Sequence, residues 1–174
     1  ITERLVGSEM CIRDRTTRKF ATFAIGNAAF HTDELYGPLT AAVDPLMHLL
    51  DASEEAKTRS NACAALGNLV RNSSVLCSLM VSSGALDAII NLIAGPTEGN
   101  EVVVDVDIVK IAIYSLGNVC RHRVCRERVE SRRLVPLLDE LARQGDENVK
   151  KYVVRLKAKL DAAPTNRSSS SAAK

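Results

Sequence analysis

The stretch Arg59-Ser60-Asn61-Ala62-Cys63-Ala64-Ala65-Leu66-Gly67-Asn68-Leu69-Val70-Arg71 decides the fold, because its centre occurs three times in the chain. The three copies are Ile25-Gly26-Asn27-Ala28, Leu66-Gly67-Asn68-Leu69 and Leu116-Gly117-Asn118-Val119. The first two copies lie 41 positions apart and the last two lie 50 apart. A recurrence at this interval is typical of helical solenoids, which usually present binding surfaces.

The spacing of apolar residues predicts one long helix around each copy, at residues 16–30, 57–71 and 108–121. A short helix and then a second helix with one buried stripe follow each long helix, at 33–39 and 43–50, 74–81 and 86–93, and 124–131 and 135–142. A terminal helix is predicted over 147–161. The sequence therefore predicts an all-α, armadillo- or HEAT-like right-handed superhelical solenoid of about three repeats with a C-terminal cap helix.

The same pattern divides the chain into units at 16–56, 57–107 and 108–146, with the cap helix at 147–161. The second unit contains an acidic loop at 95–107, which Gly95-Pro96 opens. Residues 1–15 lack helical periodicity and resemble a translated sequencing-adapter artefact, although they also suit the tail of a preceding helix. Residues 162–174 are rich in serine, and we expect them to be disordered.

The Gly-Asn pairs suggest two roles. Glycine costs roughly 1 kcal/mol relative to alanine inside a helix, so Gly26, Gly67 and Gly117 predict a close approach of neighbouring helices. Residues three, four and seven positions from each asparagine share its helix face, and an amide can both donate to and accept from an extended peptide. The predicted partner-binding groove contains Asn27, Asn61, Asn68, Arg71, Tyr114, Asn118 and Arg121. The alternative is that each asparagine ties its helix to the next repeat.

Other residues near the stripe are open to two interpretations. Phe20, Phe23 and Phe30 suit a core, or an exposed surface on the first unit. The third unit is locally basic, and its charges suit a solvated face or, next to a groove, an acidic or phosphorylated ligand. Its basic residues begin with Arg121, His122 and Arg123 and continue with Arg126, Arg128, Arg132 and Arg133.

Composition narrows the function further. A net charge of +2 gives no general signal for nucleic acid or membrane surfaces, and no apolar run reaches the length of a membrane span. The five cysteines are an odd number, and Cys63, Cys77 and Cys120 occupy apolar helical positions, which predicts buried free thiols in a cytosolic protein. Cys120, His122 and Cys125 lack a fourth ligand nearby, so we expect no metal and no cofactor.

Motifs of catalysis are missing from the sequence. It contains no kinase Gly-rich loop, H-R-D or D-F-G, and no G-x-S-x-G, P-loop or H-E-x-x-H. We therefore expect this segment not to be an enzyme.

The phrases Arg18-Lys19-Phe20-Ala21-Thr22-Phe23-Ala24-Ile25-Gly26-Asn27-Ala28-Ala29-Phe30-His31, Leu35-Tyr36 and Arg59 to Ser73 resemble the C-terminal armadillo region of Fused-type serine/threonine kinases. The resemblance extends from about Arg18 to Leu160. It implies a non-catalytic scaffold whose parent protein carries a kinase domain far upstream. Members of the family act in Hedgehog signalling, motile-cilium assembly and plant cytokinesis, with kinesin-type motors among their partners, which implies a cytoplasmic location near the cytoskeleton or a cilium.

One departure from general armadillo peptide binders affects the predicted partner. These proteins often have tryptophan four residues before the asparagine, whereas this chain has Phe23, Ala64 and Tyr114 there, which disfavours nuclear-import-type recognition. Two alternatives to the kinase scaffold stay open: a free-standing armadillo adaptor that binds extended peptides, and a structural spacer between domains. The pattern predicts no particular oligomeric state.

Overall fold

The computed structural model describes residues 14–94 and 105–162, and the regular structure in these two ranges is entirely helical. Its helices are α2 (Arg15–His31), α3 (Tyr36–Leu39), the 3-10 turn η1 (Thr40–Ala42), α4 (Val43–His48), α5 (Ala56–Asn68), α6 (Cys77–Ser82), α7 (Ala85–Ala94), α8 (Val106–Val119), α9 (Arg123–Ser131), α10 (Val135–Gln144) and α11 (Glu147–Leu160). The all-α prediction is confirmed for these ranges. The predicted tail, most of the leader and most of the acidic loop lie outside them.

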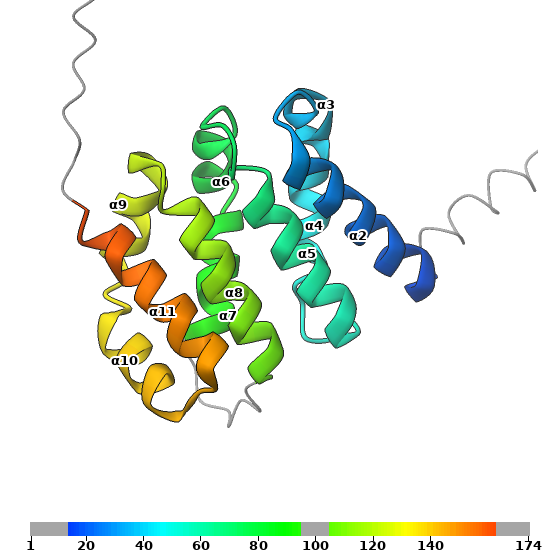
Figure 1. The fold of residues 1–174 in the computed structure, drawn as a ribbon. Helices are drawn as coiled ribbons and strands as arrows, with labels where there is room; N and C mark the ends of the chain where they lie inside the picture. Colours follow the sequence, from blue (N-terminus) through cyan, green and yellow to red (C-terminus); the bar gives the residue numbers. More distant parts are fainter. Residues whose placement is uncertain (1–13, 95–104, 163–174) are drawn as a thin grey trace, which may run out of the picture.

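The long helices α2, α5, α8 and α11 lie side by side and form one layer of the molecule (Figure 1). Behind this layer α4, α7 and α10 pack against α5, α8 and α11, respectively. The short helices α3, α6 and α9 lie at one end of the long helices (Figure 1). The same arrangement of short, second and long helix thus recurs along the stack, as the repeated sequence predicts.

Acidic residues mark the starts of the long helices. Asp14, Asp105 and Asp146 are the N-cap residues of α2, α8 and α11, and each carboxylate accepts hydrogen bonds from backbone N–H groups in the first turn. These bonds also hold the pKa of the Asp14 and Asp146 carboxyls below the usual range. The helical part of the chain therefore includes residues that we expected in the leader and in the acidic loop.

Apolar residues between the two layers form one continuous core. Leu66 and Leu116 on the long helices and Leu86 and Ile89 on α7 are fully buried within it. Small residues, such as Ala62 and Ala112, occur on the long helices where the core is most crowded. The core extends from α2 to α11, so each repeat is stabilised chiefly by its neighbours.

The three repeated glycines have different surroundings. A Cβ atom added at Gly67 would lie 2.6 Å from the Cβ and 2.9 Å from the Cα of Ser115 on α8, so nothing larger than hydrogen fits there. At Gly26 a Cβ would lie 3.5 Å from the Cβ of Ala65, and at Gly117 it would lie 3.6 Å from the flexible side chain of Arg155. Both are ordinary van der Waals contacts. The close approach inferred from the sequence is therefore found at Gly67.

Alanine substitutions at two of these glycines should have opposite effects. Gly67→Ala should lower the free energy of unfolding by about 2 kcal/mol, because the new methyl group overpacks the α5–α8 contact. Gly26→Ala should raise it by about 0.5 to 1 kcal/mol, because alanine favours the helix and its methyl group fits. Denaturant titrations of both variants test this, and an equal response at the two sites would contradict the geometry.

Candidate functional site

The exposed side of the long-helix layer is the surface that the sequence selects. Four sets of side chains follow one another across it at matching distances from the N-caps of α2, α5, α8 and α11. The first two sets are Phe20, Asn61, Ile111 and Tyr152, and Phe23, Ala64, Tyr114 and Arg155. The other two are Asn27, Asn68, Asn118 and Lys159, and Phe30, Arg71, Arg121 and Ala162. We call this surface the long-helix face.

The asparagines on this face are tied into a chain of hydrogen bonds that crosses the helices. Asn68 Nδ2 donates to the Gly26 carbonyl oxygen at 3.0 Å, and Asn118 Nδ2 donates to Asn68 Oδ1 at 3.4 Å. Arg155 Nη2 then donates to Asn118 Oδ1 at 2.6 Å. Asn68 and Asn118 are only 8% and 1% exposed, so their amides serve mainly to join neighbouring repeats.

Two further asparagines of the predicted groove are more accessible. Asn27 is exposed at the N-terminal end of the row. Asn61 is half-buried, and its Nδ2 donates to the Lys19 carbonyl oxygen at 3.1 Å. Among the asparagines of the three Gly-Asn pairs, Asn27 is therefore the one whose side chain is exposed in the described part of the chain.

Arg71 and Arg121 lie beyond the asparagines at the carboxyl ends of α5 and α8. The guanidinium carbon of Arg71 lies 3.6 Å from the centre of the Phe30 ring, a cation–π contact between neighbouring repeats. Arg121 Nη1 donates to the Arg71 carbonyl oxygen at 3.1 Å. The two arginines are thus held in place at the same edge of the long-helix face.

Tyr114 contributes to an aromatic contact at the C-terminal end of the stack. Its ring packs edge to face against Tyr152 of α11, with ring centroids 5.2 Å apart. The guanidinium carbon of Arg155 lies 4.9 Å from the Tyr114 ring centroid. Tyr114 is consequently half-buried, and α11 covers part of its surface.

A hollow of about 410 Å³ opens between the amino-terminal halves of α5 and α8. Ala64 and Ile111 form part of its wall, and Asp105 and Asp107 lie at its edge together with Lys57 and Lys110. Ala64 occupies the position where α2 has Phe23 and α8 has Tyr114, so the missing bulk opens the space.

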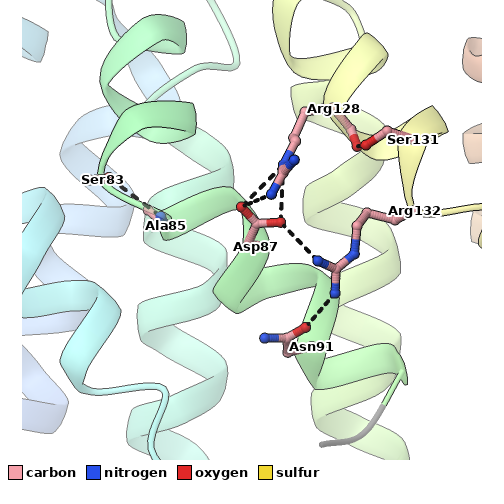
Figure 2. A network of polar contacts seen from close by, with 7 residues as sticks. All are labelled: Ser83, Ala85, Asp87, Asn91, Arg128, Ser131 and Arg132. Carbon is pink, nitrogen blue, oxygen red and sulfur yellow. Dashed lines mark hydrogen bonds and ion pairs between the residues drawn. The ribbon is translucent and has the colours of Figure 1, made fainter. Parts of the chain in front are cut away.

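Arginines on α9 have a different environment. Arg128 binds both carboxylate oxygens of Asp87 on α7, with its Nη2 2.9 Å from Asp87 Oδ2, and Arg132 reaches Asp87 and Asn91 (Figure 2). Arg123 and Arg126 pair with Glu127 and Glu130 within α9. These charges join adjacent repeats or lie neutralised on one helix.

Four cysteines and His122 lie in the part of the chain that the structure describes. Burial raises the pKa of the Cys63 and Cys120 thiols to about 12, which keeps them protonated at neutral pH. Cys77 and Cys125 are also buried and free, and His122 lies 2.5 Å from the Val70 carbonyl oxygen through its Nε2. Burial lowers the pKa of His122. Within the described ranges, no three metal-ligating side chains gather at one point.

Comparisons with known structures support this geometry. A designed armadillo repeat protein matches 83% of the chain with a TM-score of 0.68 at 24% identity, over 58% of its own length. A designed armadillo repeat protein in complex with the peptide (KR)4 matches 82% with a TM-score of 0.69 at 22% identity, over 57% of its length. The model of the armadillo/beta-catenin-like repeat matches residues 41–71. This chain has the armadillo-repeat fold.

The chain is also similar in sequence to a curated protein. It is 39% identical over 128 residues to the serine/threonine-protein kinase TIO of Arabidopsis thaliana, an alignment that covers 70% of the chain. The same alignment covers 10% of TIO, so the chain spans about a tenth of that kinase. The matched repeat model starts in η1 and ends just after α5. It therefore crosses the boundary that we predicted between residues 56 and 57, and the division into units stays a prediction. None of the described helices combines the length and apolar character needed to cross a bilayer.

Sequence reasoning missed two residues that organise this face. The Tyr36 hydroxyl is buried 2.6 Å from the Asn68 carbonyl oxygen and accepts a hydrogen bond from the Asn72 backbone N–H, which joins α3 to the end of α5. The second is Arg155 of the cap helix, which contacts Asn118 and Tyr114. The sequence could have indicated this role, because Arg155 is as many residues from the N-cap Asp146 as Tyr114 is from the N-cap Asp105.

The exposed and buried asparagines should respond differently to substitution. Asn68→Ala should lower the free energy of unfolding by about 1 to 2 kcal/mol, because the Gly26 carbonyl and the Asn118 amide each lose a buried partner. Asn27→Ala should change it by less than about 0.5 kcal/mol, because its side chain is exposed. Chemical denaturation of the two variants gives both values, and a large loss at Asn27 would contradict this assignment.

The Asp87 network gives a second test of contacts between repeats. Asp87→Asn should lower stability by about 1 kcal/mol, because Arg128 and Arg132 lose their shared carboxylate. Glu127→Gln is the matched control, since it removes an exposed pair within one helix and should cost about 0.3 to 0.5 kcal/mol. Thermal unfolding measures both, and equal shifts would show that Asp87 does not join the repeats.

Proposed function

We propose that this chain is a non-catalytic protein-interaction scaffold and that it binds an extended segment of a partner along the long-helix face. The observation that carries the proposal is the continuous surface of four parallel long helices with matched side-chain positions. The armadillo fold supports it, and one designed protein of this fold has been solved in complex with a peptide.

The surface itself is suited to such a segment. Phe20 and Phe23 are 63% and 54% exposed on α2, next to the exposed amide of Asn27. The hollow at Ala64 follows on the next helix. Exposed aromatic rings, one open amide and a hollow in succession offer apolar contacts, a hydrogen bond and a side-chain pocket, in that order.

The identity to TIO supports a narrower proposal, that the chain is the armadillo segment of a Fused-like serine/threonine kinase. On that proposal the kinase domain lies elsewhere in the parent protein, and kinesin-type motors and signalling proteins are the first partners to test, at the cytoskeleton or a cilium. The transcript 5′ of the codon for Arg15 tests it. A kinase domain in the same reading frame is expected, and an unrelated domain in that frame would contradict it.

A photo-cross-linking experiment tests the interaction face. p-Benzoylphenylalanine replaces Asn27 on the long-helix face or, as a matched control, Glu127 on α9, and each protein is irradiated with purified kinesin-type motors and in cell extract. Discrete cross-linked partners are expected from position 27 and not from position 127, because only the first lies on the proposed surface. Equal labelling from both positions, or labelling from 127 alone, would overturn the proposal and favour a spacer or a different face.

A further inference from the structure

The arginines of this chain fall into two groups with different charge compensation. On α9, Arg123, Arg126, Arg128 and Arg132 all have carboxylate partners, which are Glu127, Glu130 and Asp87. On the long-helix face, Arg71, Arg121 and Arg155 form no ion pair with any residue of the described ranges. The basic charge of α9 is therefore neutralised, whereas the arginine charge on the long-helix face is left uncompensated.

The uncompensated arginines follow the direction in which the repeats are stacked. Arg71 and Arg121 stand at matching positions just beyond the carboxyl ends of α5 and α8, three residues after Asn68 and Asn118. Phe30 stands at the matching position on α2 and is 38% exposed. A segment that crosses the long helices at this edge meets Phe30, then Arg71 and then Arg121.

Both arginines are held in position before any partner arrives. Arg71 packs on Phe30, which helps to bury its Nη1, while its Nε and Nη2 donate no hydrogen bond to any residue in the described part of the chain. Arg121 uses one N–H group in a hydrogen bond to the Arg71 carbonyl oxygen. A guanidinium has five N–H donors, so each side chain keeps donors for a ligand while its freedom is already reduced.

We propose that the partner segment is an acidic, extended peptide whose aspartate or glutamate side chains bind Arg71 and Arg121 along this edge. Carboxylates are the natural occupants, because charge-assisted hydrogen bonds to arginine are short, strong and frequently bidentate. A basic peptide, such as the (KR)4 of the designed complex, would place like charges together here. This inference rests on the proposed function and adds the chemistry of the partner.

Selection from a displayed library of random, unphosphorylated twelve-residue peptides tests the charge of the ligand. The selected peptides are then irradiated with the protein that carries p-benzoylphenylalanine in place of Asn27, and they are grouped by whether this side chain cross-links to them. Peptides labelled from position 27 should carry a net negative charge. Their Kd values, measured by fluorescence anisotropy, should rise as NaCl increases from about 0.05 to about 0.5 M, because salt screens such contacts.

Paired charge variants then locate the contact. Arg71→Gln with Arg121→Gln should raise the Kd of a selected peptide about tenfold or more, and the same two positions changed to lysine should recover part of the loss. The control, Arg123→Gln with Arg143→Gln, removes the same charge from exposed pairs on α9 and α10 and should change the Kd less than about twofold. Circular dichroism establishes that each variant is folded. If the double variant is unfolded, Arg121→Gln alone replaces it in the measurement, because Arg121 is exposed.

The outcomes separate this inference from the function on which it rests. Neutral or basic peptides labelled from position 27, or equal loss in both pairs of variants, would overturn the acidic ligand and leave the interaction face intact. No labelling from position 27 by any bound peptide would overturn both.

Discussion

The contact between α5 and α8 at Gly67 and Ser115 is the constraint on which the rest of the long-helix face depends. The Cβ of Ser115 lies 2.6 Å from the position that a Cβ of residue 67 would take, and the Ser115 hydroxyl donates to the Cys63 carbonyl oxygen at 3.1 Å. This close approach brings Asn118 within reach of Asn68, and Arg121 within reach of the end of α5. The absence of one side chain thus fixes how the polar groups of two repeats meet.

The polar residues between repeats divide into those that hold the stack and those left for a partner. Tyr36, Asn68 and Asn118 form hydrogen bonds with one another or with the backbone in buried positions, and half-buried Asp87 pairs with Arg128 of the next repeat. Phe20, Phe23 and Asn27 are exposed on the same layer of helices. Since polar groups buried between helices cost free energy unless they are paired, a stack that pairs them internally limits recognition to the side chains that remain.

Helix positions were predictable from the sequence because burial imposes a period on it. The helices α2, α9, α10 and α11 lie within one or two residues of the predicted ranges, as expected when apolar spacing and capping signals agree. The helix α8 begins two residues before its predicted start, within the same margin, and Asp105, which we placed in an acidic loop, is its N-cap. An acidic residue before a helix can belong to a loop or can be the N-cap, and its hydrogen bonds are needed to distinguish the two.

Side-chain roles across repeats were less accessible to sequence reasoning. The three glycines share one motif, yet the residue opposite each one, Ala65, Ser115 or Arg155, decides how much room it has. Similarly, Asn27 and Asn118 occupy equivalent positions in the repeated motif, yet the Asn27 side chain is exposed and Asn118 is only 1% exposed. Their environments depend on whether a further helix lies on the other side, and local spacing does not carry that information.

The amide chain across the long helices has a direction. Every donor in it points toward the amino-terminal neighbour, from Arg155 through Asn118 and Asn68 to the Gly26 carbonyl. Hydrogen bonds in such a series polarise one another, and a cation at the first donor strengthens the effect. The charge of Arg155 therefore polarises the Asn118 amide beside it, and the bonds that follow are aligned with it as far as α2.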